Sequence, residues 1–550
     1  MNTTTTRSIL SVCMFVVSLH TALADDTAFR QGISGILGGS DPDAAVVVSG
    51  NRLHGVRIIR RLYEANGFHP LWNHNSAGSL GDALSDIWID GLTPGDFQFE
   101  EIVGHLQSHR PASLPIAEAV RADMLLTEAF LRAVYNLYFG KADPERLDPN
   151  INFTRSYEGD DPVPFLLESI AKGRIGEAFD WARPKNTRYQ WLRQGMALYR
   201  QYQSAGGWDP IPTGSVLKPG VTDLRVAMLR KRLAVTGDLP ADSLEMGNAR
   251  FFDEALKYAL EHFQKRHGID ADGIAGADTL KVMNVPVQDR IDQIRVNLER
   301  WRWIAHEAYD EFLVVDIAGF DIYWVRNGQV LWKEKIQVGK DYTQTPVFKG
   351  EIKYIEMNPT WTLPPSILND SVIPALRKDP SYLDRKGYQL LTLEGERVNP
   401  LNVNWAELKG FPYLVRQPAG PDNALGLVKF LFPNRHYVYL HDTNHRELFS
   451  QAKRTSSSGC IRVRNPFDLA ERLLEPVPGW TRDRIDTVVA SGETTRVNLE
   501  RPMRILIAYN TARVPSQTSQ VHFHPDIYSR DARVLAALDG PFQLRARDAP

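Results

Sequence analysis

The sequence predicts a multidomain α+β protein with a helical scaffold, a small three-helix module and a β-rich domain that carries an inserted lid. Three observations support this prediction. Apolar residues recur at three- and four-residue intervals over about residues 50–210, as on the buried faces of helices. A Gly- and Pro-rich stretch at 206–220 separates this part from two further amphipathic helices. From Phe312 onward apolar residues run continuously or alternate, which is typical of strands.

Residues 1–24 have the order of a secretory signal peptide. Arg7 precedes an apolar run at 9–19, and a small-x-small site follows at 22–24. We expect cleavage there and a periplasmic mature protein, with an uncleaved inner-membrane anchor as the alternative. The remaining sequence offers no firm membrane span. The net charge of −2 gives no reason to expect nucleic acid or an acidic membrane surface as a partner.

The number of cysteines limits the possible roles of Cys460. The sequence has 2 cysteines, Cys13 and Cys460. Because Cys13 would leave with the signal peptide, Cys460 would have no partner for a disulfide within the mature chain. Cys460 is then an intermolecular partner, a buried inert residue or a free thiol with a chemical role.

The helical part divides at the Gly- and Pro-rich stretch. We assign 25–215 to the scaffold, 216–290 to the three-helix module and 291–310 to a linking helix. The scaffold shows no catalytic constellation, although its aromatic residues leave a substrate-binding role open. In the module, apolar positions define helices around 226–233 and 256–267, and a turn rich in Asp and Gly leads to a third helix at 279.

The β-rich domain is expected over 311–510, followed by a C-terminal extension over 511–550 whose polar tail is uninformative. Asn327-Gly328 predicts a two-residue hairpin, because both turn positions need positive φ. The Asn-Pro-Phe-Asp run at 465–468 predicts a capped helix start. Further strands are expected at 353–357, 435–440 and 503–509, with the lid at about 364–416.

One histidine and the lone mature cysteine lie 19 residues apart, at His441 and Cys460. A thiol is only a few per cent ionised at neutral pH, so a nucleophilic cysteine needs a base nearby. His441 is the candidate base, because an unperturbed imidazole pKa of about 6.5 suits proton transfer.

The expected strand ending at His441 places Tyr437, Tyr439 and His441 on one face. Asp442 would point to the opposite face, so we expect a backbone carbonyl to orient the imidazole. Small residues at 456–459 let the backbone turn tightly before Cys460. The amides of Gly459 and Cys460 are therefore candidate oxyanion donors.

Several stretches carry a family resemblance. NALG at 423–426 with Lys429-Phe430, YLHDT at 439–443 and SSGCIRV at 457–463 resemble the YkuD-type L,D-transpeptidase catalytic domain. The module resembles the peptidoglycan-binding module through Phe263-Gln264 and the turn that follows. The whole layout is similar to the large periplasmic branch of the family in Gram-negative bacteria.

The resemblance implies a reaction. In that family the cysteine attacks the carbonyl between the third and fourth residues of a tetrapeptide stem, releases D-alanine and keeps a thioester. An amine of a second stem then forms a direct link between third residues. Cys460 would be the nucleophile and His441 the base, without a cofactor. Asp442 and Ser458 replace a glycine and a second histidine of the commoner pattern, as in the large branch. Carbapenem inhibition and a role in cell shape are also implied.

Other candidate contacts are less specific. Arg462 could hold a stem carboxylate through its planar fork, or form a structural ion pair. Tyr439 and Ser458 could line the pocket, with packing as the alternative for Tyr439. Trp361 is a groove wall or a core residue. The lid would exclude water from the thioester.

Competing functions remain open. A zinc site at His441, His445 and Cys460 lacks a fourth ligand and a recognisable spacing. An L,D-carboxypeptidase would use the same thioester with water as acceptor. A non-catalytic cell-wall-binding protein would need the module alone. The expected partners are peptidoglycan stem peptides, glycan and other cell-wall synthesis enzymes.

Overall fold

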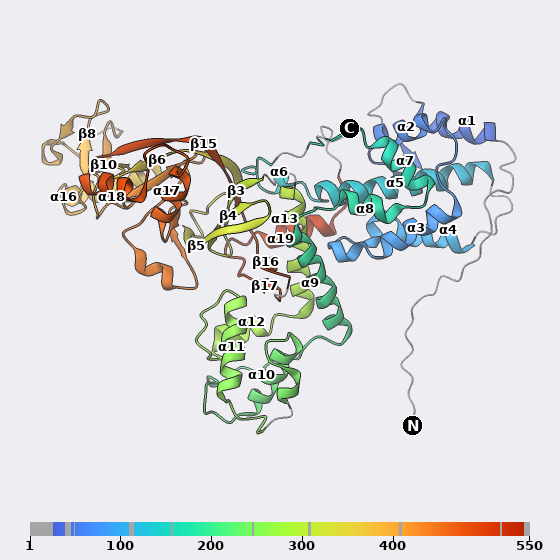
Figure 1. Cartoon of the computed structure of the whole chain (residues 1–550), viewed down its shortest axis with the longest axis horizontal. Coiled ribbons are helices and arrows are strands. Elements are labelled where there is room, and N and C mark those ends of the chain that lie inside the picture. The colour runs from blue at the N-terminus through green and yellow to red at the C-terminus, as the bar shows by residue number, and fades with distance from the viewer. Residues whose placement is uncertain are drawn as a thin grey trace.

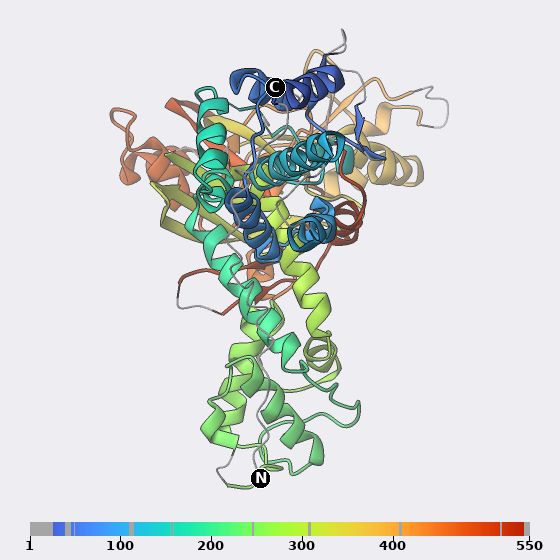
Figure 2. The same cartoon turned by 90° about the vertical axis from the view of Figure 1, so that its right-hand side faces the viewer.

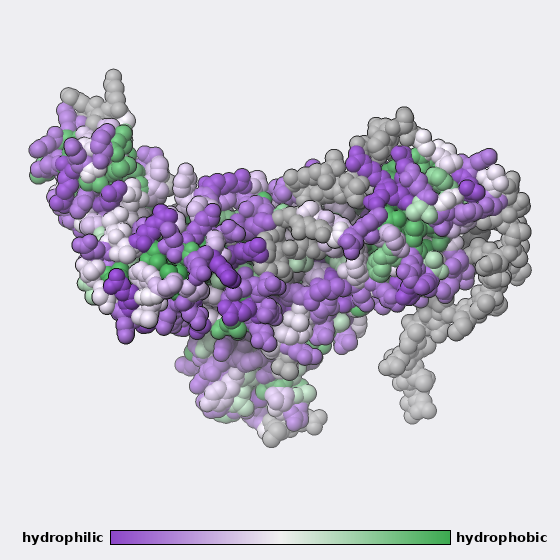
Figure 3. All heavy atoms as spheres, turned by 45° about the horizontal axis from the view of Figure 1, so that its top comes forward, coloured by the Kyte–Doolittle hydropathy of each residue, from purple (hydrophilic) through white to green (hydrophobic). Residues whose placement is uncertain are grey.

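A computed structural model describes residues 26–38, 46–48, 50–108, 115–153, 156–157, 159–244, 247–305, 310–405, 410–517 and 520–543. The expected signal peptide, residues 1–24, lies outside these ranges. Within them, no helix combines the length and apolar composition that crossing a bilayer requires. The face seen in Figure 3 is mainly hydrophilic, with hydrophobic side chains in small separate patches.

The N-terminal region is helical, as predicted, and lies to one side of the molecule (Figure 1). Its long helix α5 is buried on several sides, because residues such as Met124, Phe130 and Leu137 face neighbouring helices all round it. A short β1–β2 hairpin at Val47–Val48 and Asn51–Arg52 accompanies the helices. The helices are α1 Asp26–Leu37, α2 Val56–Ala65, α3 His74–Ser85, α4 Phe99–Ser108, α5 Ile116–Phe139, α6 Pro144–Leu147, α7 Val163–Ala171, α8 Ile175–Ala182 and α9 Thr187–Ser204.

The small module projects from the rest of the molecule, as Figures 1 and 2 show. It consists of α10 Leu224–Val235, α11 Glu254–Arg266 and α12 Ala277–Met283, around a core of its own. The Gln264 side chain holds the turn between α11 and α12, since its amide donates to Asp272 Oδ1 and to the Ile274 carbonyl. The three-helix prediction is confirmed.

Helix α13 at Val287–Ile304 lies between the domains and packs against α9 and α19. Its charged side chains are buried in pairs. Arg302 contacts Glu299 at 2.6 Å and donates to the Asp90 carbonyl at 2.7 Å. The helix expected to link the domains over 291–310 is thus α13, which begins earlier, at Val287. Its side chains contribute to the core between the domains.

The C-terminal domain is built on a curved sheet, nine strands within the described residues. Its order is β13-β5-β14-β12-β11-β6-β15-β3-β4, and an extra β4–β5 pairing brings the far edge round to β5. Asn327 and Gly328 have φ of 49° and 76°, so the predicted hairpin is present. The strands are β3 Glu311–Asp316, β4 Asp321–Arg326, β5 Gln329–Gly339, β6 Phe348–Met357, β11 Val428–Leu431, β12 Leu440–His441, β13 Thr455–Ser457, β14 Ile461–Val463 and β15 Thr495–Ala508.

Two helices, α17 Pro466–Leu474 and α18 Arg482–Ser491, pack near this sheet. The start of α17 at Pro466 agrees with the sequence, but the capping role of Asn465 is wrong. The Asn465 side chain donates to Glu334 Oε2 at 2.6 Å and makes no cap to the helix. The Asn465 side chain therefore bonds to a carboxylate distant in the sequence and does not cap the helix.

The predicted lid region forms a small inserted subdomain, which we define as residues 361–417. Its four-stranded sheet has the order β7-β10-β8-β9, and residues such as Leu376, Leu390 and Trp405 form a separate core. The elements are β7 Trp361–Thr362, α14 Pro365–Ile367, a π-turn at Leu368–Val372, α15 Ile373–Lys378, α16 Tyr382–Arg385, β8 Gln389–Leu391, β9 Arg397–Val398 and β10 Leu414–Gln417.

The C-terminal extension is more ordered than its polar composition suggested. It contains β16 Ala512–Arg513, β17 His522–Phe523 and α19 Asp531–Asp539. Asp531 pairs with Arg300 of α13 at 2.6 Å, and Tyr528 donates to the Gly339 carbonyl at 2.6 Å. This segment joins α13 to the sheet.

The prediction of a strand at 435–440 is wrong for most of these residues. Only Leu440 and His441 belong to β12, and Tyr437 has φ of 55° and is 83% exposed. The Asn434 Oδ1 atom accepts the amides of His436 and Val438, which closes a turn instead. Tyr437 therefore does not share a strand face with Tyr439 and His441.

Candidate active site

Two short parallel strands bring the candidate residues together. Leu440 of β12 pairs with Ile461 of β14, and His441 pairs with Arg462. The Ile461 amide donates to the Tyr439 carbonyl at 3.1 Å. Cys460 consequently stands beside Tyr439, immediately before β14 begins, and His441 stands two residues further along the neighbouring strand.

Cys460 is a free, half-buried thiol. Burial raises the pKa of Cys460, while hydrogen bonding with Tyr439 and the charges of Lys429 and Arg462 act in the opposite direction. The Sγ atom faces the Tyr437 carbonyl at 3.7 Å. The net upward shift keeps the resting group as a thiol at neutral pH.

His441 is almost fully buried, with 3% of its surface exposed. Burial, followed by the positive charge of Arg462, lowers the pKa of His441 to about 3. The imidazole is therefore neutral at neutral pH and can accept a proton. Its ring lies edge-on to Tyr439, with 5.6 Å between ring centres.

The surroundings of His441 favour backbone groups as its orienters. The Asp442 carboxylate is engaged elsewhere, accepting from the Leu427 amide at 3.0 Å and from Arg446 at 2.8 Å. The backbone groups of Asp442 and Leu425 oppose the lowering of the His441 pKa. Within the described residues, Nδ1 of His441 makes no hydrogen bond of ordinary geometry.

The turn before Cys460 depends on Gly459, whose φ of 111° is unfavourable for residues with a Cβ. Thr345 Oγ1 donates to the Gly459 carbonyl at 2.9 Å, which fixes the turn from the β5–β6 loop. The Gly459 amide donates to Ser457 Oγ at 3.2 Å. Of the two predicted oxyanion donors, the Cys460 amide has no such partner among the described residues, whereas the Gly459 amide is already engaged.

Arg462 reaches the same region without an acidic partner. Its Nη1 donates to Gln337 Oε1 at 3.2 Å, and its Nε is buried and unpaired within the described part of the chain. Among the described residues no ion pair includes Arg462, although the charge of Glu447 opposes the lowering of its pKa by burial, so the structural ion pair is disfavoured. Ser458 is exposed on the turn beside Cys460.

Trp361 and Tyr439 connect the inserted subdomain to the candidate site. Trp361 is half-buried on β7, and hydrogen bonding with it opposes the effect of burial, which raises the pKa of Tyr439. Lys429 Nζ lies 4.2 Å from the centre of the Tyr439 ring. Trp361 therefore lies at the border of the site, as either a wall or a packing residue.

Sequence reasoning gave Lys429 no role, although it lies opposite His441 in the β11–β12 ladder. Its pKa is lowered, mainly by burial. The available signal was a lone lysine between the apolar residues Val428 and Phe430. Such a residue on a central strand is costly to bury unless a charged partner or substrate is near.

The zinc alternative gains no support from the geometry. His445 is exposed and its Nδ1 contacts Glu447 at 3.4 Å. Across the described ranges, no three His, Cys, Asp or Glu side chains gather in a group that could hold a metal ion.

Comparison with known families agrees with this geometry. Residues 310–495 match the L,D-transpeptidase catalytic domain. This chain carries an L,D-transpeptidase catalytic domain. Residues 57–196 match a scaffold domain, and residues 222–283 match a putative peptidoglycan-binding domain. The resemblance identified in the sequence is confirmed for these parts.

A curated relative supports the assignment of the L,D-transpeptidase domain. A putative L,D-transpeptidase of Haemophilus influenzae is 33% identical over 246 residues, which cover 44% of this chain and 49% of the relative. The match thus spans about half the length of that relative.

Solved structures of L,D-transpeptidases are also similar, at low identity. One from Xylanimonas cellulosilytica is 16% identical, covers 54% of this chain and 99% of its own, and has a TM-score of 0.18. One from Mycobacterium smegmatis is 14% identical, covers 36% of this chain and 58% of its own, and has a TM-score of 0.17. The assignment of the domain rests on the family match and the curated relative.

Proposed function

We propose that the chain is a peptidoglycan L,D-transpeptidase that links the third residues of two stem peptides through a thioester on Cys460. The β12–β14 pairing carries this proposal, because it sets a buried neutral imidazole beside the strand that directly follows a free thiol. The match of residues 310–495 to the catalytic domain supports the same reaction class.

The first half-reaction begins from two neutral groups. Cys460 Sγ attacks the carbonyl carbon between the third and fourth stem residues, and the thiol proton passes to His441. The Cys460 amide donates to the oxyanion as it forms. When the carbon–nitrogen bond breaks, D-alanine leaves as an amine that takes the proton from His441. A thioester remains on Cys460.

The second half-reaction transfers the acyl group. An amine of a second stem attacks the thioester carbonyl, His441 accepts the amine proton, and the cysteine sulfur leaves and is reprotonated. Arg462 lies nearby without a carboxylate partner and is suited to hold a stem carboxylate in place. The inserted subdomain, reached through Trp361, would reduce the access of water to the thioester.

The test uses purified tetrapeptide-bearing fragments with product analysis by mass spectrometry. Wild-type protein is expected to form dimers, and Cys460→Ala to form none. His441→Gln is expected to slow dimer formation at least about 100-fold. His445→Gln is the matched control and should stay within about twofold, because His445 is exposed and pairs with Glu447. Dimers made by Cys460→Ala would show that the nucleophile is another group.

The same products separate two alternatives. Tripeptides without dimers would identify an L,D-carboxypeptidase, which uses water as the acceptor. Binding of stem fragments without any product would identify a non-catalytic cell-wall-binding protein. A carbapenem should leave a covalent adduct on Cys460, measured as a mass increase that Cys460→Ala lacks.

The proposal includes a location and a ligand. An enzyme that acts on peptidoglycan works outside the cytoplasm, which agrees with a periplasmic protein carrying a signal peptide. The module at 222–283 would hold peptidoglycan while the catalytic domain acts. Contacts with other cell-wall synthesis enzymes remain part of this proposal, to be tested by pull-down with full-length protein.

A further inference from the structure

A cavity of about 470 Å³ lies where five parts of the chain meet. Its walls come from residues 147–153 at and after the end of α6, the end of α13, the β5–β6 loop at 344–347, residues 508–510 at the end of β15 and the C-terminal extension at 528–534. Neither Cys460 nor His441 lines it. The cavity is therefore separate from the candidate active site.

The lining carries an excess of positive charge. It contains Arg300, Arg530 and Arg533 but a single carboxylate, that of Asp148. Arg300 is already paired with Asp531 at 2.6 Å, and Arg533 is exposed. Arg530 is half-buried, and no ion pair among the described residues includes it, although the charge of Asp148 opposes the lowering of its pKa by burial.

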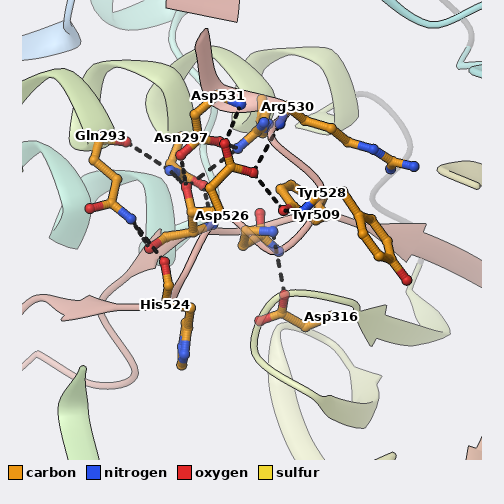
Figure 4. A network of polar contacts seen from close by, with 12 residues as sticks. Gln293, Asn297, Asp316, Tyr509, His524, Asp526, Tyr528, Arg530 and Asp531 are labelled. Atoms are coloured by element: carbon orange, nitrogen blue, oxygen red, sulfur yellow. Dashed lines mark hydrogen bonds and ion pairs between the residues drawn. The ribbon is translucent and has the colours of Figure 1, made fainter. Parts of the chain in front are cut away.

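The guanidinium of Arg530 is held in place but not saturated. Its Nη2 donates to Gln344 Oε1 at 3.0 Å and to the Thr345 carbonyl at 3.1 Å, which are both neutral acceptors. The group lies 4.9 Å from the ring centre of Tyr528, and its Nη1 is buried without an acceptor. Figure 4 shows the Arg530 side chain extending away from the carboxylates of Asp526 and Asp531.

A second unpaired polar atom lines the same cavity. Asn510 is 5% exposed, and its Oδ1 is buried with no hydrogen-bond partner within the described residues. Leaving such a buried group unpaired is unfavourable, because the group has lost its hydrogen bonds to water without a replacement. The cavity thus offers a cationic donor and a neutral acceptor, next to apolar walls that include Trp303 and Val347.

We propose that this cavity binds the carboxylate end of an N-acylated amino acid or short peptide. The carboxylate would accept from Arg530 through its planar fork, and the amide N–H of the same residue would donate to Asn510 Oδ1. The ligand's side chain would pack against the apolar wall. One terminal residue carries these groups side by side, which neither a bare phosphate nor a neutral amide does.

The test is a ligand-detected NMR titration of the full chain with N-acetylalanine as the probe, in both enantiomers. Saturable binding is expected, and Arg530→Gln should weaken it at least about tenfold, the loss of one charge-assisted hydrogen bond. N-acetylalanine amide, which lacks the carboxylate, should bind at least about tenfold more weakly than the acid. Arg533→Gln, the matched exposed control, should change the affinity less than about threefold.

Asn510→Ala keeps the proposal testable if Arg530→Gln does not fold. It should weaken N-acetylalanine but leave inorganic phosphate unaffected. Absence of saturable binding, which would mean that water alone fills the cavity, would overturn the proposal. Equal binding of the acid, its amide and phosphate, or equal losses in the Arg530 and Arg533 variants, would also overturn it.

Discussion

The inserted subdomain and the C-terminal extension both adjoin the catalytic sheet, yet they are held in different ways. The subdomain at 361–417 has its own sheet and its own core, and its strands pair with one another. Among the described residues of the C-terminal extension, β16–β17 is the only strand pair, and side chains of the extension bond to α13 and to the β5–β6 loop. A cover with its own core can move or unfold as a unit, whereas a segment shared between domains cannot.

The largest expected effect is in the inserted subdomain. Trp405 is 7% exposed and its Nε1 donates to the Pro400 carbonyl at 2.8 Å. Trp405→Ala should cost about 3–5 kcal/mol, because it removes a large side chain from a small core. Limited proteolysis should then cut within 361–417 while the melting of the catalytic sheet stays unchanged.

Exposed Leu401→Ser is the control for that substitution, since Leu401 is 67% exposed, and it should not increase cleavage. Cooperative loss of the whole catalytic domain in Trp405→Ala would mean that the subdomain is not an independent unit.

In the C-terminal extension, Asp531→Ala should destabilise the whole assembly by about 3 kcal/mol. Its carboxylate pairs with Arg300 and accepts from Thr511 Oγ1 at 2.7 Å, so its loss leaves a buried cation without a partner. Calorimetry should show a lower melting temperature for scaffold and sheet together.

Asp539→Ala is the matched control on the same helix. Asp539 pairs with Arg295 at 2.7 Å, but its side chain is 54% exposed. The expected cost is below about 1 kcal/mol. Equal effects of the two variants would contradict the difference in burial.

The stability of the two regions should also depend differently on pH. The inserted subdomain contains no histidine, whereas burial lowers the pKa of His522 to about 3 and lowers that of His524. Such histidines bind more protons when unfolded, so their contribution to stability is present above pH of about 6.5 and is lost as pH falls toward 3.

Hydrogen exchange measured at pH 7 and at pH 5 should therefore show the C-terminal extension losing protection at pH 5 together with α13 and the sheet that it contacts. His522→Asn should flatten that dependence, because it removes one titrating group. An unchanged pH slope in the variant would count against a role for His522.

The smallest effect expected is at Tyr528. Its hydroxyl donates to the Gly339 carbonyl and accepts from the Thr345 amide at 3.3 Å, and Thr345 in turn holds Gly459. Tyr528→Phe should cost about 1 kcal/mol. It should also slow carbapenem acylation of Cys460 roughly fivefold, through a less well positioned turn. Tyr342→Phe, on the β5–β6 loop that also carries Thr345, is the control; Tyr342 is 79% exposed, and the variant should leave the rate unchanged.

Local signals in the sequence predicted much of the fold. Helical periodicity, the Asn327-Gly328 turn and the Pro466 helix start each depend on neighbouring residues, and the structure has all three. That His441 lies near Cys460 was also expected, because a nucleophilic thiol needs a base and because both motifs carry the family resemblance; the β12–β14 pairing brings their segments together. The absence of a strand before His441 was not expected, because the Asn434 side chain forms a turn that apolar alternation does not reveal.

Contacts between distant segments explain the remaining differences. Asn465 bonds to Glu334, and the polar residues after 530 pair with α13 more than 200 positions earlier. From its polar composition alone, the segment after residue 530 would be predicted to be a solvated tail. Neighbouring residues do not indicate which arginine each of its carboxylates pairs with. The hydrogen bond from the Gly459 amide to Ser457 Oγ likewise could not be predicted from the sequence, because it depends on where the structure places the Ser457 side chain.

The place of β15 in the sheet has a consequence for biogenesis. This strand lies between β6 and β3, pairing Ile505 with both Leu313 and Gly350, although it is the last of the nine to be synthesised. A chain that emerges from its N-terminus first must hold the edges of β3 and β6 unpaired until residue 508 is available. Such high contact order slows folding and leaves strand edges open to aggregation. A chain that ends before β15 would therefore contain both His441 and Cys460 but lack the strand that closes the sheet around them.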